Sequence, residues 1–415
     1  MANGNEKDLL QEQVYWQRLT VNRLRREVFQ QADPSQPTAL IERLKNEEAK
    51  LSDLESQLHG IQPSDPTTGS LVNTQRSAPL VLGAESTGLA AQIYLRMAQV
   101  PTAIYHLLKA EQSPLVSCWV KNCATKGPIR RVRVTSYIDG YSARAVNTFE
   151  LPPSIEYTFN QLPTLFPDRI RDLDELTRAS LNLVVEDLDT QHTEIHETKP
   201  IWMLARNAAP LAVKDPKTDV WQDLSIYFGA FVTPNAPVIL EFLRLAVNHH
   251  PEGRLIGYQI NAGQVESQVK ALYDALQTEA AIKYVNSLIT FTPEAGLSNQ
   301  RVRLPRESLK DKEANCIDGT VLFASLLEAV SLSPGIVLVP GHAFVAWETW
   351  RESPSQWKFL ETTMIGSSSF EEACASAEKT AATYQQLATS TKDPTAFRLL
   401  PVHYLRTKLG ITPME

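Results

Sequence analysis

Asn315-Cys316-Ile317-Asp318-Gly319 begins the stretch of sequence that decides the fold of the C-terminal part of this chain. From Ile317 to Val330 the residues are apolar on nearly every side of a helix, which predicts a buried helix with Cys316 at its N-terminal end. Unpaired N–H groups and the positive end of the helix dipole favour a thiolate at such a position. Most single cysteines are packing residues, so Cys316 is either one of these or a nucleophile.

A histidine follows at the start of a predicted strand. Ile336-Val337-Leu338-Val339 indicates a buried strand, Pro340-Gly341 interrupts it, and the apolar pattern resumes over 343–347. His342 lies 342 − 316 = 26 residues after Cys316, which leaves room for a helix, a turn and a strand that returns over the helix. A general base must come within roughly 3 Å of the thiol, and this spacing allows it. Alternatively, His342 packs at a strand end with its ring nitrogens bonded to the backbone.

An acidic residue is the third candidate for a catalytic role, after Cys316 and His342. Trp357-Lys358-Phe359-Leu360-Glu361 predicts a further strand, and Arg351-Glu352-Ser353-Pro354-Ser355 has the composition of a hairpin that joins it to the preceding one. Adjacent antiparallel strands would bring Glu361 near the His342 end, where a carboxylate can bind the second ring nitrogen and fix its tautomer. The alternative is a glutamate at a strand end that faces water.

Together these residues resemble a known family. A cysteine at a helix start, a histidine in a strand and an acid in the next strand is the order of the transglutaminase-like cysteine protease superfamily. More narrowly, Gln300-Arg301-Val302-Arg303-Leu304-Pro305, Asn315-Cys316-Ile317-Asp318 and Pro340-Gly341-His342-Ala343-Phe344 look like the transglutaminase-like domains of large bacterial proteins, some of which belong to conflict and defence systems. The resemblance covers roughly the last two hundred residues and is strong over only about sixty-five of them. It departs at Glu361, where many relatives carry Asp.

The resemblance implies acyl transfer on a protein substrate through a Cys316–His342–Glu361 triad, without a cofactor or a metal. The backbone N–H of Cys316 would supply one oxyanion donor, and Gln300 is the candidate for the second unless it is an ordinary surface glutamine. Asp318 is expected to stabilise the first turn of the helix or to bind a loop. The predicted activity is that of a cysteine protease or related amide hydrolase. The alternative is an inactive transglutaminase-like domain that serves as a binding module.

Composition limits the classes of protein that fit. The chain has 415 residues, of which 43% are hydrophobic and 21% charged, so it has room for two or three globular domains. A formal net charge of −7 argues against nucleic acid as the main partner. Four cysteines are too few for a disulfide scaffold. Residues 1–8 lack the apolar core of a signal peptide, and no run reaches the ~18 apolar residues of a membrane span. We therefore expect a cytoplasmic protein with no membrane partner.

The fold class is predicted to be α+β, in three parts. Apolar residues in helical steps over 10–28 and 40–58, on either side of a Pro-containing break, predict an antiparallel, coiled-coil-like α-hairpin over 1–60. Its seams either bury each other or mediate self-association or partner docking through residues 6–59, as in an assembly adaptor. Residues 61–80 have the composition of a linker. Short apolar runs over 81–210 predict a β-sandwich, and 211–415 would form the papain/transglutaminase-like α+β domain.

Individual elements follow from the same patterns. Strands are predicted at 115–120, 132–137, 143–149, 155–159, 180–185 and 195–204, and helices at 220–231, 237–247, 264–276 and 370–387. His192 and His196 are four residues apart, as zinc ligands on a helix can be. On a strand, however, four residues span about 13 Å, so we do not predict a metal site.

Overall fold

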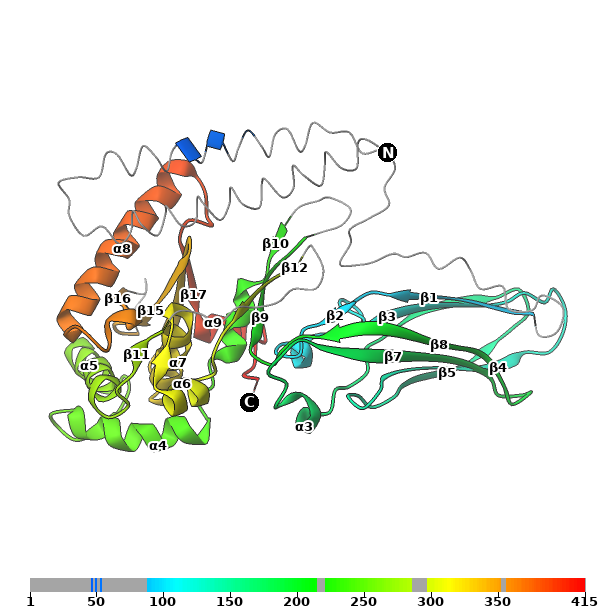
Figure 1. Cartoon of the computed structure of the whole chain (residues 1–415), viewed down its shortest axis with the longest axis horizontal. Coiled ribbons are helices and arrows are strands. Elements are labelled where there is room, and N and C mark those ends of the chain that lie inside the picture. Colours follow the sequence, from blue (N-terminus) through cyan, green and yellow to red (C-terminus); the bar gives the residue numbers. More distant parts are fainter. Residues whose placement is uncertain are drawn as a thin grey trace. The chain divides into compact units, whose positions relative to one another are not determined.

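The computed structural model describes residues 46–47, 49–50, 53, 88–214, 221–285, 297–351 and 356–414 (Figure 1). Helices and sheets are both present, so the protein is of mixed α and β structure as predicted. Most of the predicted N-terminal hairpin over 1–60, and all of the linker over 61–80, lie outside the described residues; the five described between 46 and 53 are helical. The short segment Val339–His342 belongs to a different compact unit from the residues described on either side of it.

Two sheets form from residues 89–203. The first has the order β1-β3-β6 and consists of β1 (Leu89–Leu95), β3 (Val116–Asn122) and β6 (Glu156–Gln161). The second has the order β2-β8-β7-β4-β5 and consists of β2 (Gln99–Val100), β8 (His192–Met203), β7 (Thr177–Asp187), β4 (Arg130–Ile138) and β5 (Ala145–Leu151). All six strands predicted in this region are present. Short helices η1 (Tyr105–Leu107) and α3 (Pro167–Ile170) connect them.

One hydrophobic core joins the two sheets. Every second residue of β7 from Ala179 to Val185 is buried, because successive side chains of a strand point to opposite faces. These residues pack with Val116, Cys118 and Val120 of β3 in the first sheet. Pairing is antiparallel throughout except between β2 and β8.

Residues 208–407 contain the remaining elements. The helices are η2 (Ser225–Phe231), α4 (Pro237–Ala246), η3 (Val247–His249), α5 (Ala262–Thr278), α6 (Pro305–Asp311), α7 (Cys316–Ala329), η4 (Thr362–Met364), α8 (Phe370–Thr391) and α9 (Val402–Thr407). One sheet has the order β16 (Trp357–Leu360), β15 (His342–Glu348), β14 (Pro334–Val339), β17 (Arg398–Pro401). Another has the order β10 (Trp221–Asp223), β9 (Ala208–Lys214), β12 (Leu297–Arg301), and β11 (Lys283–Tyr284) pairs with β13 (Glu313–Ala314).

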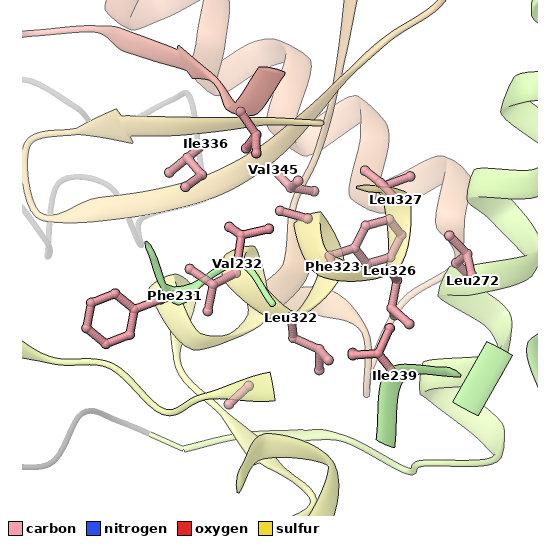
Figure 2. Packing of buried hydrophobic residues seen from close by; sticks show 14 of the residues in the cluster. Phe231, Val232, Ile239, Leu272, Leu322, Phe323, Leu326, Leu327, Ile336 and Val345 are labelled. Carbon is pink, nitrogen blue, oxygen red and sulfur yellow. The ribbon is translucent and has the colours of Figure 1, made fainter. Parts of the chain in front are cut away.

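The elements of residues 208–407 enclose a second hydrophobic core. Helix α7 lies at its centre, in contact with α4, α5 and α6 (Figure 1). All its residues from Ile317 to Leu327 are buried, as the uniformly apolar sequence predicts. Figure 2 shows the side chains that surround it: Leu322, Phe323, Leu326 and Leu327 of α7 with Phe231, Val232, Ile239, Leu272, Ile336 and Val345. Full burial of each large apolar side chain stabilises the fold by about 1.5–3 kcal/mol. The helix that begins with Cys316 is therefore held on several sides.

One predicted helix is wrong in its first half. Residues 220–231 were expected to form a single helical segment, but β10 pairs with β9 and only Ser225–Phe231 is helical, as a 3₁₀ helix. Asp223 accepts hydrogen bonds from the backbone N–H and the hydroxyl of Ser225, at 3.2 and 2.9 Å, and pairs with Arg398. These bonds form a turn between the strand and the helix, which an apolar period does not reveal.

Candidate functional site

Cys316 is the first residue of α7, as predicted. Asn315 forms the N-cap: its side-chain oxygen accepts the N–H of Asp318 at 2.9 Å, while the Asp318 carboxylate accepts the N–H of Asn315 at 3.1 Å. This reciprocal capping box ends the preceding β13 and starts the helix at Cys316. Cys316 is half-buried, in contrast to the fully covered residues that follow it. Its sulfur is thus carried at the positive end of a buried helix.

A buried ion pair fixes this first turn to a distant segment. Asp318 has no exposed surface, and its two oxygens accept the backbone N–H of Arg303 at 2.8 Å and the Arg303 guanidinium at 3.0 Å. The guanidinium also binds Glu313 at 3.1 Å. Burial raises the pKa of the Asp318 carboxyl above its ordinary value, and the hydrogen bonds from Asn315 and Arg303 act in the opposite direction. Asp318 therefore stabilises the first turn and binds a loop, as the sequence predicted.

Glu361 directly follows β16 and is buried, with an exposed fraction of only 3%. The alternative of a glutamate that faces water is therefore wrong. Its Oε1 accepts the hydroxyl of Thr363 at 2.7 Å and the backbone N–H of Thr363 at 3.1 Å, and so caps η4. The next residue, Thr362, packs against Gly319 in the first turn of α7. The segment that carries the acid thus contacts the turn that begins with the cysteine.

His342 is the first residue of β15 and is half-buried, which agrees with its predicted position at a strand start. Strands β15 and β16 are antiparallel neighbours, as predicted, with pairs from Val345–Leu360 to Glu348–Trp357. Glu361 follows Leu360 along β16, and His342 precedes Val345 by three residues along β15. His342 belongs to one compact unit, and Cys316 and Glu361 belong to the other.

Gln300 lies in β12, where it is half-buried and paired with Ala209 of β9. It is not Gln300 but Arg303, three residues later, that bonds to the first turn of α7. The structure therefore connects the Gln300–Pro305 motif to the first turn of α7 through Arg303, a role that the sequence motifs did not indicate. Since Arg303 and Asp318 both lie in the quoted motifs, an expected ion pair between them was the available signal.

The other cysteines have different surroundings. Burial raises the pKa of the Cys118 thiol to about 12, and burial, followed by the charge of Glu266, raises the pKa of the Cys374 thiol to about 12. Cys123 is exposed in the loop after β3. Cys374 and Lys270 are among the residues that line an open cavity of about 490 Å³ between α5 and α8. Thiols with raised pKa values are poor nucleophiles near neutral pH.

Two further features concern ligands and membranes. His192 and His196 lie on β8, as predicted; His192 is 3.7 Å from Glu194, and His196 contacts Asn182. Within the described ranges, no group of three or more His, Cys, Asp or Glu side chains is arranged to hold a metal ion. Among those same residues, no helix combines the length and the apolar character that crossing a membrane requires.

The sequence matches no protein-family model and no curated protein.

Proposed function

We propose that this protein is a cysteine-dependent acyl-transfer enzyme acting on amide bonds of proteins, with Cys316 as nucleophile, His342 as general base and acid, and Glu361 as the carboxylate that orients the imidazole. One observation supports this most directly. The turn that carries the buried Glu361 packs, through Thr362, on Gly319 in the helical turn that begins with Cys316. A buried carboxylate and a half-buried thiol at a helix N-terminus are the groups that such a triad needs.

The chemistry would proceed in two steps. The thiolate of Cys316 attacks the amide carbonyl carbon and forms a C–S bond, and the carbonyl oxygen becomes an oxyanion that the Cys316 backbone N–H stabilises. Protonated His342 then donates its proton to the amide nitrogen, the C–N bond breaks, and a thioester and a free amine result. In the second step neutral His342 takes a proton from water or from a primary amine, which attacks the thioester and releases the thiolate.

The outcome of the second step defines the activity. Water gives peptide hydrolysis or, on a glutamine side chain, deamidation, whereas an amine gives a cross-link. All three share the same thioester, so all three belong to the proposed chemistry. A papain/transglutaminase-like domain over 211–415, a β-sandwich over 81–210 and a role as an effector in a bacterial conflict system belong to the same proposal and rest on the resemblance of the motifs.

The test begins with Cys316→Ala, and Cys374→Ala serves as the matched control. Three assays cover the possible outcomes: fragmentation of fluorescein-labelled casein, ammonia release from casein, and incorporation of dansylcadaverine. Because the thiolate forms the covalent bond, we expect Cys316→Ala to lose at least about a thousandfold in rate. Cys374→Ala should retain activity, since its half-buried thiol has no part in the reaction. Persistence of activity in Cys316→Ala would refute the assignment.

His342 needs a separate measurement. Iodoacetamide alkylation of Cys316, followed by mass spectrometry of its peptide, reports the thiolate directly. If His342 forms an ion pair with the thiol, His342→Gln should move the pH midpoint of alkylation upward. An identical pH profile in His342→Gln, together with no activity of the unaltered protein in the three assays, would instead support the inactive binding module.

A further inference from the structure

Gly319 has no room for a side chain. A Cβ atom at this position would lie 2.8 Å from Oγ1 and 3.0 Å from Cβ of Thr362, with Ala314 next at 3.9 Å. Carbon atoms in contact are normally separated by about 3.5–4.0 Å, so α7 and the turn at Thr362 approach as closely as a glycine allows. Gly319 lies within the helical turn that begins with Cys316.

Thr362 is 4% exposed, and its hydroxyl finds no hydrogen-bond partner within the part of the chain that the structure describes. Buried hydroxyls usually form a hydrogen bond. Because no such bond is found for the Thr362 hydroxyl among the described residues, hydrogen bonding does not explain where this side chain lies. Its close approach to Gly319 is a packing contact. The approach of α7 and η4 is thus limited by the bare backbone of Gly319 on one side and by the side chain of Thr362 on the other.

Glu361 cannot move independently of this turn. Its carboxylate is bonded to the backbone N–H and the hydroxyl of Thr363, on the other side of Thr362 in sequence. The far end of the turn is also held, because the Tyr273 hydroxyl lies 3.0 Å from the carbonyl oxygen of Met364. Beyond it, a Cβ on Gly366 would meet the carbonyl oxygen of Ile282 at 2.8 Å. A shift of Thr362 away from α7 would therefore carry Glu361 with it.

We propose that the Gly319–Thr362 contact is a positioning device that sets the distance between the Glu361 turn and the Cys316 helix. This inference rests on the proposed function, since it presumes that Glu361 acts on the imidazole that serves Cys316. Neither residue touches the reacting atoms; both act through Glu361. The contact requires the smallest residue on the helix and a branched, compact one on the turn.

The experiment adds a methyl group at residue 319 and then removes the hydroxyl oxygen of Thr362, the atom that this methyl group would meet at the shortest distance. In a Cys123→Ser/Cys374→Ser background, which removes the exposed and the half-buried competing thiols, the alkylation of Cys316 by iodoacetamide is measured against pH for Gly319→Ala, Thr362→Ala and the double variant. Displacement by a few tenths of an ångström should lower the rate of alkylation at pH 7, and kcat on labelled casein, by about tenfold in Gly319→Ala with KM unchanged. The double variant should recover most of this loss, because Thr362→Ala removes the atom at 2.8 Å.

Gly229→Ala is the matched control. A Cβ at Gly229 would meet Leu405 Cδ1 at 2.7 Å in the same hydrophobic core, but on α9 rather than η4. It should lower stability without moving the alkylation profile or kcat. An unchanged profile in folded Gly319→Ala, or an equal change in Gly229→Ala, would overturn the inference. If Gly319→Ala does not fold, Thr362→Ala alone provides the test, since it removes the atom at 2.8 Å and changes the size of the contact from the other side, and a wild-type profile in this variant would overturn the inference equally.

Failure of the proposed function gives a different pattern. Activity that survives Cys316→Ala would reject the triad and the positioning device with it, whatever Gly319→Ala does. Loss of activity in Cys316→Ala, combined with an unchanged alkylation profile and kcat in Gly319→Ala, would leave the proposed function intact and reject the positioning device alone.

Discussion

Two buried carboxylates differ in their partners: Asp318 belongs to the first turn of α7, and Glu361 precedes Thr362, which packs on that turn. Asp318 is fully buried. Its carboxylate accepts hydrogen bonds from the guanidinium and the backbone N–H of Arg303, and from the backbone N–H of Asn315. Glu361, with 3% exposed, accepts the N–H and the hydroxyl of Thr363. The first joins two segments of chain through a salt bridge, and the second caps a single turn that packs on the helix.

The difference distinguishes a structural carboxylate from a candidate functional one. A charge that is bonded to an arginine and to two backbone groups has most of its acceptor capacity in use, and removing a partner leaves a buried charge uncompensated. The Glu361 carboxylate instead accepts hydrogen bonds from a hydroxyl and an N–H of the adjacent turn, so these bonds tie it to η4. We therefore expect changes at Asp318 to affect mainly the free energy of unfolding, and changes at Glu361 to affect mainly the rate.

The largest effect is expected from breaking the ion pair. Arg303→Met should lower the free energy of unfolding by about 3–5 kcal/mol at pH 7, because Asp318 is left charged and buried. Urea unfolding followed by circular dichroism measures this. In Arg303→Met/Asp318→Leu both charges are absent, so the double variant should lose less than the sum of the two single variants. Additive losses would mean that the two side chains do not interact.

At Glu361 the expected effect is on the rate. Glu361→Gln keeps the shape of the side chain but removes its charge, so kcat on labelled casein should fall by about ten- to a hundredfold. The free energy of unfolding should change by less than about 1.5 kcal/mol, because an amide oxygen can still accept from Thr363. A large loss of stability with an unaltered rate would assign Glu361 the same structural role as Asp318.

A smaller effect is expected from the hydroxyl that holds Glu361. Thr363→Val retains the backbone N–H but removes the hydroxyl donor at 2.7 Å, which is worth about 0.5–1.5 kcal/mol. We expect a several-fold decrease in kcat, smaller than that of Glu361→Gln. Thr363→Ser keeps the hydroxyl and should restore the rate, and equal rates in the Val and Ser variants would show that the hydroxyl does not orient the carboxylate.

The smallest effect concerns pH and contrasts Asp318 with Asp223. Burial raises the pKa of Asp318 above its ordinary value of 3.8, so its contribution to stability is present below that pH and is lost as the pH rises through the folded-state pKa. Burial also acts to raise the pKa of Asp223, but the hydrogen bonds from Arg398 and Ser225 outweigh it and the pKa is lowered. Its contribution is present above 3.8 and is lost as the pH falls through the folded-state pKa.

Urea unfolding between about pH 3 and pH 6 checks both signs. The stability of the unaltered protein relative to Asp318→Asn should decrease as the pH rises. Its stability relative to Asp223→Asn should increase over the same range. Parallel curves for the two variants would show that the two carboxyls respond to burial alike.

Local sequence determined the elements that carry the candidate residues. The uninterrupted apolar run after Cys316 predicts a helix covered on all sides, and the structure contains it with Cys316 as its first residue. Apolar runs likewise predict the strand around His342 and the strand over 357–361, and the structure contains them as β15, which begins at His342, and β16, which ends at Leu360. Where a polar side chain ended an element, as Asp223 does between β10 and η2, periodicity alone gave the wrong structure.

The tertiary structure decided which of these residues contact each other. Arg303 and Asp318 are joined by a bond between side chains, and Gly319 and Thr362 meet although 362 − 319 = 43 residues separate them. The burial of Glu361 has the same origin, since a strand end faces water unless another segment covers it. Sequence patterns report the repeat of a single helix or strand, whereas these contacts depend on how separate elements pack, and packing is specified by the whole core at once.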